Sequence, residues 1–254
     1  MIPIALAAVS ARGGAVTGYT YAYLAAVMIS GVTSATLGLT TMPQLVAALH
    51  ERGRAVAREY LDAVSPFSVF IYVPVAAAYA CFAHPLLEAL LGGSLTAGTI
   101  ELLWDASRIF LLMALAWALL APLTTLAFSL ELFSGLAIVS AATVATQVVL
   151  VLATRSRGAE AVAVAHAVSG TVLVALVLVL VFRREAPAAA ARAVALSLPA
   201  PALALVFPAV AALGLDGSVP AAIAGALIAG ALYAGLSLIL WPAVARRALA
   251  LLRR

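Results

Sequence analysis

Seven long apolar stretches follow one another along the 254 residues, and they decide what this chain can fold into. The sequence is 66% hydrophobic and only 9% charged, whereas a water-soluble domain keeps about 25% charged residues to solvate its surface. Polar side chains are therefore too few to cover a soluble domain of this size. The composition predicts a polytopic membrane protein.

The best-defined stretch is Leu132–Ala153, which contains no charged residue. A helix of this length reaches about 33 Å at 1.5 Å per residue, enough to cross a hydrocarbon core of about 30 Å. Helices are expected because backbone polar groups in lipid must be satisfied within the segment. We therefore predict an all-α bundle of seven transmembrane helices. The spans are Thr17–Leu45, Ser65–Leu91, Trp104–Leu126, Leu132–Ala153, Ala161–Phe182, Val194–Leu213 and Val219–Val244.

The basic residues are all arginines, and they predict the orientation. If the Thr17 end is outside, ten arginines face the cytoplasm and three or four lie outside, as the positive-inside rule expects. A lysine-free, alanine-rich and arginine-rich composition is typical of a high-GC bacterial genome. We therefore predict a multi-pass protein of the bacterial plasma (inner) membrane with a cytoplasmic C-terminus. The cytoplasmic set is Arg52, Arg54, Arg58, Arg183, Arg184, Arg192, Arg246, Arg247, Arg253 and Arg254.

Several function classes are disfavoured by the residues that are missing. Without lysine, the chain has neither a retinal Schiff-base residue nor a P-loop. It has no HExxH motif, no pair of intramembrane aspartates, and only three widely separated histidines. We expect no enzyme activity, cofactor or metal. The arginine clusters are interpreted as topology determinants beside anionic lipid rather than as a nucleic-acid site.

Polar residues within the apolar spans are the candidates for function, because such residues are costly in lipid. One set lies on a common stripe of the first span, within about 60° at 100° per residue. This stripe either lines an aqueous cavity or packs against a neighbouring helix through small hydroxyl side chains. Its members are Tyr19, Tyr23, Ser30, Ser34 and Thr41.

Four further polar residues stand out. Asp105 and Arg108 have i,i+3 spacing at the start of the third span and form either a structural anchor or a gate. Gln147 and His166 lie deeper and predict a polar core. They serve either as hydrogen-bonding groups between helices or, for His166, in proton coupling. Pro122 predicts a break or kink at the end of the third span.

A motif in the first span carries a family resemblance. Residues 14–24 read GAVTGYTYAYL, and Ser30-Gly31 and Met42-Pro43-Gln44-Leu45 follow. The motif, with the amphipathic Glu51–Asp62 segment and the Gly92-Gly93 loop, resembles the lipid II flippase (MurJ/MviN) family. This family belongs to the multidrug/oligosaccharidyl-lipid/polysaccharide exporter superfamily.

The resemblance implies that the chain corresponds to the C-terminal half of the family fold. Residues 1–16 would be the remnant of a preceding helix and its outer turn. Residues 17–183 would form a C-lobe-like five-helix bundle, and residues 184–254 two additional helices and a basic cytoplasmic tail. It also implies alternating access for a lipid-linked saccharide, with a missing N-terminal lobe or a second copy completing the cavity.

The chain departs from the family at one important place. Members carry an Asp-Arg pair after the Tyr-Ala pair, and this chain has Tyr23 and Leu24 there. The resemblance assigns the family's arginine to the lipid-linked pyrophosphate, so substrate specificity is expected to differ. Two alternatives to a flippase component therefore stay open. One is a non-transporting, truncated scaffold of cell-envelope synthesis, and the other is a small-molecule efflux component.

Overall fold

The computed structural model describes residues 15–31, 36–154 and 159–244, and these form helices joined by short turns. No strand occurs among them, so the all-α prediction is confirmed for this part of the chain. The elements are α2 (Ala15–Ser30), α3 (Thr36–Arg52), η2 (Gly53–Ala55), α4 (Val56–Leu91), α5 (Ala97–Ser129), α6 (Phe133–Thr154), α7 (Ala159–Phe182), η4 (Arg183–Glu185), α8 (Ala186–Ser197), α9 (Pro199–Leu203), α10 (Val206–Ala211) and α11 (Val219–Leu240).

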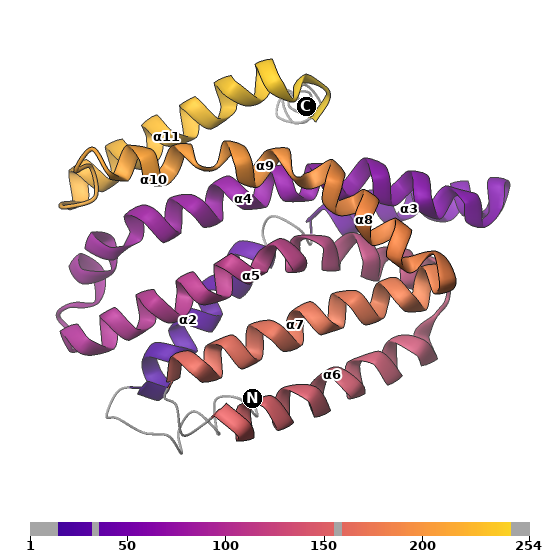
Figure 1. Ribbon diagram of the computed structural model, residues 1–254, viewed down its shortest axis with the longest axis horizontal. Helices are drawn as coiled ribbons and strands as arrows, with labels where there is room; N and C mark the ends of the chain where they lie inside the picture. Colours follow the sequence, from indigo (N-terminus) through magenta and orange to yellow (C-terminus); the bar gives the residue numbers. More distant parts are fainter. Residues whose placement is uncertain (1–14, 32–35, 155–158, 245–254) are drawn as a thin grey trace.

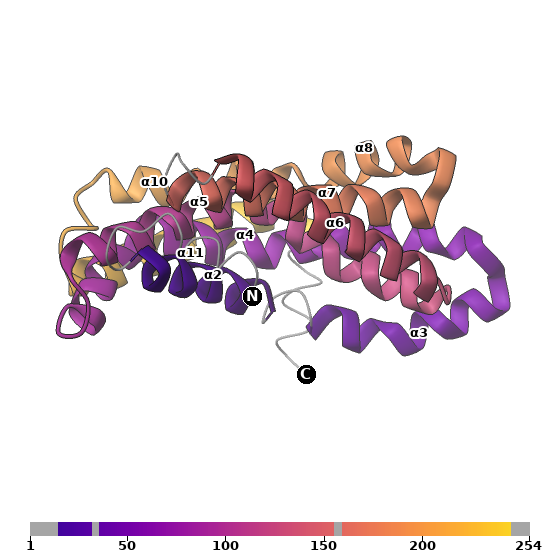
Figure 2. The ribbon, with the colours of Figure 1, turned by 90° about the horizontal axis from the view of Figure 1, so that it is seen from below.

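The long helices lie side by side in a slab (Figure 1). Across the slab the order is α11, then α9 and α10, then α4, α5, α7 and α6. The second view shows α2 and α3 together on one face (Figure 2), where α2 packs mainly against α5. Helix α5 therefore lies at the centre of the packing, with α2, α4 and α7 around it.

Several long apolar helices indicate a multi-pass membrane protein. Among the described residues, four stretches are long and apolar enough to cross a membrane, or five if the two halves of α5 form one bent span. The two longest, Thr40–Leu91 and Ala161–Ala211, reverse direction at η2 and η4 (Figures 1 and 2). Each therefore contains more than one helical arm. The predicted total of about seven crossings stays a prediction.

Most predicted spans coincide with observed helices. Leu132–Ala153 corresponds to α6, and Ala161–Phe182 to α7. Ser65–Leu91 is contained in α4, which ends at Leu91 before a turn at Gly92 and Gly93. Trp104–Leu126 and Val219–Val244 similarly overlap α5 and α11. The hydrophobic pattern is therefore a good guide to where these helices lie.

Two predicted spans differ from the structure. The span Thr17–Leu45 is divided between α2 and α3, and residues 32–35 between them lie outside the described residues. Val194–Leu213 is also not one helix, because it contains the end of α8, then α9 and α10. Pro199, Pro201 and Pro208 fall in this segment, and each lacks the N–H that would continue a regular helix.

Pro122 does not end α5 as predicted, because the helix continues to Ser129. The bend that the structure shows, 53° between Ala97–Leu111 and Ala116–Ser129, lies earlier in the helix. The Ser68 hydroxyl of α4 donates a hydrogen bond to the Ala118 carbonyl. This is the carbonyl that Pro122, four residues later, cannot reach with an N–H. The neighbouring helix thus supplies the missing donor.

The hydrogen bond lost at Pro74 in α4 is replaced in the same way. It leaves the carbonyl of Phe70 without a helical donor. The Tyr233 hydroxyl of α11 donates to that carbonyl at 3.1 Å. At Pro122 and Pro74, therefore, a hydroxyl from a packed neighbouring helix satisfies the carbonyl that the proline leaves without a donor.

The arginine-bearing turns meet at one end of the slab, at the right of Figure 1. Arg192 forms a 2.7 Å ion pair with Asp62, and Arg58 lies 3.7 Å from Glu185. These contacts join the start of α4 to η4 and α8. The two clusters that the sequence assigns to the same side of the membrane are thus at the same end of the molecule, while Arg155, Arg157 and the C-terminal arginines lie outside the described residues.

Candidate functional site: a polar cavity between four helices

A cavity of about 550 Å³ lies between α2, α5, α6 and α7. Its walls combine aromatic rings, small residues and hydroxyl or amide groups. A cavity of this size falls in the range typical of small-molecule sites. The lining residues are Tyr23, Val27, Ser30, Gly31, Trp117, Leu120, Ala121, Thr124, Ser140, Thr143, Val144, Gln147, His166, Ser169, Gly170 and Leu173.

Four residues from two different sets that the sequence analysis selected meet at this cavity. Tyr23 and Ser30 come from α2, where they were placed on the polar stripe. Gln147 comes from α6 and His166 from α7. Sequence spacing alone does not bring them together, since they span more than 140 positions of the chain. The packing of α2 and α7 on α5 brings them to one place.

His166 is held by an aromatic cluster behind the cavity wall. The hydroxyl of Tyr19 lies 2.8 Å from its Nδ1, and the Tyr19 side chain is fully buried. With Tyr19 donating, the imidazole is neutral and carries its proton on Nε2. The rings of Tyr23 and Phe110 pack around the imidazole, at centroid distances of 4.8 and 5.4 Å. Tyr19 is therefore a positioning residue rather than part of the cavity surface.

Trp117 depends on a glycine in the facing helix. A Cβ on Gly170 would overlap the Trp117 indole nitrogen. The absence of a side chain at Gly170 thus allows the indole to lie against α7 and form part of the cavity wall. Any larger residue there would displace the ring from its position in the cavity wall.

The hydrogen-bonding groups of the cavity divide into acceptors and donors. The hydroxyls of Thr124, Thr143 and Ser169 donate to carbonyls of their own helices, so their lone pairs remain available. The buried Nε2 amide of Gln147 has no hydrogen-bond partner. A buried donor left unsatisfied costs about 1–3 kcal/mol. The cavity is therefore suited to a molecule that both donates and accepts hydrogen bonds.

The remaining candidates lie away from the cavity. Thr41 is in α3, with its hydroxyl 2.9 Å from that of Tyr60. Ser34 lies outside the described residues. Asp105 and Arg108 approach to 3.9 Å on an exposed face of α5, and the Arg108 guanidinium lies 4.6 Å from the Trp104 ring centroid. The stripe predicted along one helix is thus split between two helices.

Sequence reasoning missed five polar or aromatic members of the wall. Thr124 and Trp117 are in α5, Ser140 and Thr143 in α6, and Ser169 in α7. A single Ser or Thr in an apolar span usually serves helix packing, so nothing in the sequence set these residues apart. Their shared orientation becomes visible only when the four helices are assembled.

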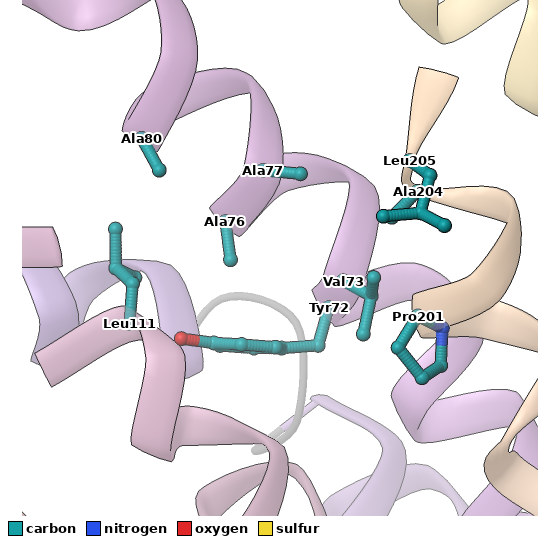
Figure 3. Close-up of a pocket in the computed structure, with 9 residues that line it drawn as sticks. All are labelled: Tyr72, Val73, Ala76, Ala77, Ala80, Leu111, Pro201, Ala204 and Leu205. Carbon is teal, nitrogen blue, oxygen red and sulfur yellow. The ribbon is translucent and has the colours of Figure 1, made fainter. Parts of the chain in front are cut away.

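A second pocket, of about 230 Å³, has fewer polar groups in its wall. It lies between α4, the bend of α5 and the α9–α10 region, and its lining is almost entirely apolar (Figure 3). The ring of Tyr72 crosses it with the hydroxyl directed toward Leu111. That hydroxyl is buried and has no hydrogen-bond partner. A water molecule needs two to four polar partners, so this pocket is unsuited to hold one.

Comparison with protein families, with curated proteins and with solved structures finds no match for this chain.

Proposed function

We propose that this protein is a membrane transporter component in which the polar cavity receives the head group of a lipid-linked saccharide. The lipid tail would remain in the bilayer while the head crosses by alternating access. The proposal agrees with the resemblance of residues 14–45 to lipid II flippases. The observation that carries it is the convergence of polar groups from α2, α5, α6 and α7 on one cavity of a largely apolar bundle.

The chemistry of the wall favours a neutral, hydroxyl-rich head group. None of its residues is an aspartate, glutamate or arginine. Sugar hydroxyls both donate and accept hydrogen bonds, as the Gln147 amide and the Thr and Ser hydroxyls require. Tyr23 and Trp117 add aromatic faces for the apolar side of a sugar ring. We therefore assign the cavity to the saccharide rather than to the phosphate of the substrate.

A phosphate-linked substrate then needs positive charge from outside this cavity. In the proposal that charge comes from a complementary half, either a separate N-terminal lobe or a second copy of the chain. The exposure of α6 is consistent with an incomplete wall, because only Thr143 and Val151 of this helix are buried. Its exposed apolar residues, such as Ile138 and Val149, are available to lipid or to that second half.

The test is a lipid-translocation assay in proteoliposomes, which measures how fast the head group moves between the two leaflets (called exchange below). The purified protein, alone and with its complementary half, would be reconstituted with a fluorescent polyprenyl-linked saccharide, and a membrane-impermeant quencher would report which leaflet holds the label. We expect the active assembly to accelerate exchange and the double variant Tyr23→Leu/Ser30→Leu to return it to background. Ala77→Leu, in the apolar pocket, is the matched control and should exchange normally.

Two results would redirect the assignment. Full activity of the double variant would remove Tyr23 and Ser30 from the substrate path. A lack of exchange in every assembly would favour the alternative of a non-transporting scaffold. The efflux alternative is tested in the same vesicles with small neutral dyes, because the uncharged wall offers no carboxylate to a cationic drug.

A further inference from the structure

A second polar cleft, independent of the cavity, lies at the arginine-bearing end of the molecule. It has a volume of about 260 Å³ and is formed where the turn between α3 and α4 approaches the turn between α5 and α6. One part of its wall is apolar and the other is polar and charged. The lining residues are Val46, Leu49, His50, Gly53, Arg54, Ser129, Leu130 and Glu131.

The cleft contains opposite charges that do not pair with each other. Nearby arginines are satisfied internally, since Arg52 bonds Glu59 at 2.6 Å and Arg192 bonds Asp62 at 2.7 Å. Within the described part of the chain, by contrast, neither Arg54 nor Glu131 forms an ion pair. A cation and an anion are thus both present in one cleft, with each left available to a ligand.

Glu131 is also held in a conformation that favours glycine. Its φ is 57°, and it follows the end of α5 in a pair of capping hydrogen bonds, from Glu131 N to Phe128 O and from Leu132 N to Ala127 O. This is the Schellman arrangement, in which the left-handed position is usually glycine. A glutamate there adds an acidic residue to the lining of the cleft, although glycine would fit this backbone conformation better.

We propose that this cleft binds the head group of a phospholipid that carries both a phosphate and a primary ammonium, as phosphatidylethanolamine does. The Arg54 guanidinium binds the phosphate, with His50 beside it, and the Glu131 carboxylate accepts hydrogen bonds from the ammonium. Val46, Leu49 and Leu130 contact the start of the acyl chains. Their presence favours a lipid over a soluble phosphate ester.

This arrangement predicts which lipids are rejected. Phosphatidylglycerol brings no cation, so Glu131 would remain unpaired next to an anionic lipid. Phosphatidylcholine carries a positive charge but no N–H to donate to the carboxylate. The site therefore discriminates through the carboxylate, while Arg54 contributes to binding of all three lipids.

The experiment is native mass spectrometry of the purified full chain, titrated with matched acyl-chain versions of the three lipids. We expect phosphatidylethanolamine to bind about tenfold more tightly than the other two, a difference of about 1.4 kcal/mol. Glu131→Gln should bring the three affinities within about twofold, and Arg54→Gln should weaken all of them by about tenfold. Arg184→Gln, an exposed arginine that does not line the cleft, should change nothing.

Glu131→Gly separates recognition from folding. Glycine suits the positive φ, so this variant should fold at least as well as the wild type and still lose the preference for phosphatidylethanolamine. Equal binding of the three lipids by the wild type, or an unchanged preference in Glu131→Gly, would overturn the proposal. Equally tight binding of soluble phosphoethanolamine would overturn the assignment to a lipid. None of these outcomes depends on whether the chain transports a saccharide.

Discussion

The polar cavity and the Tyr72 pocket are two hollows in one bundle, and they differ in what their walls can do. The first is lined by amide, hydroxyl and imidazole groups from four helices, with His166 fixed by Tyr19. The second is lined by alanines and other apolar residues, and its one hydroxyl, that of Tyr72, has no hydrogen-bond partner. The difference shows that hollow space alone does not mark a site in a membrane protein. Convergent polar groups do.

The largest expected effect is in water access. In a Cys81→Ser background, Gln147→Cys would place a thiol on the polar cavity and Ala77→Cys one on the apolar pocket, at two positions that are both half-buried. A thiol reacts as its thiolate, which needs water. We expect a hydrophilic maleimide to label Gln147→Cys about a hundredfold faster. The rates are measured by a gel-shift time course. Equal rates would show that water reaches the two hollows equally.

The next effect is loss of transport when the wall of the polar cavity is disturbed. Gly170→Val should displace Trp117 from its position in the cavity wall and lower head-group exchange by about tenfold, equivalent to about 1.4 kcal/mol of barrier. Ala77→Val, which narrows the apolar pocket, is the control and should leave the rate unchanged. Normal exchange by a folded Gly170→Val protein would show that the cavity is not the path.

A pair of tyrosine substitutions should change stability in opposite directions. Tyr19→Phe removes a hydroxyl that bonds His166 and should destabilise the fold by about 1 kcal/mol. Tyr72→Phe removes an equally buried hydroxyl that has no partner and should stabilise it by about 1 kcal/mol. Denaturant unfolding in detergent measures both. Destabilisation by Tyr72→Phe would mean that the Tyr72 hydroxyl has a hydrogen-bond partner, and stabilisation by Tyr19→Phe would mean that its bond to His166 does not stabilise the fold.

The smallest effect concerns Asp105 and Arg108, which belong to neither hollow. Their side chains are about half exposed and 3.9 Å apart, and such exposed pairs contribute about 0.2–1 kcal/mol. Asp105→Asn should therefore change the free energy of unfolding by about 0.5 kcal/mol or less and leave exchange intact. A large fall in exchange without loss of stability would instead identify the pair as a gate.

The sequence predicts some elements of the fold much better than others. Charge-free runs bounded by arginine or glutamate locate α6 and α7 almost to the residue. The pattern fails at Val194–Leu213, because hydropathy does not register that prolines interrupt an apolar run. Gln147 and His166 are visible as polar residues in apolar stretches of the sequence. Their meeting with Tyr23 depends on how each helix is rotated on α5, and a linear pattern does not contain that information.

The hydrogen bond from Tyr233 to Phe70 has a consequence for how the protein is made. Phe70 leaves the ribosome 163 residues before the tyrosine that completes its helix. Over that interval of synthesis α4 would enter the bilayer with the Phe70 carbonyl lacking a donor, a costly state in hydrocarbon. Helix α11 is therefore the last of the described helices to be synthesised and completes the packing of α4. Nascent chains that end before Tyr233 should be the ones that cellular quality control removes.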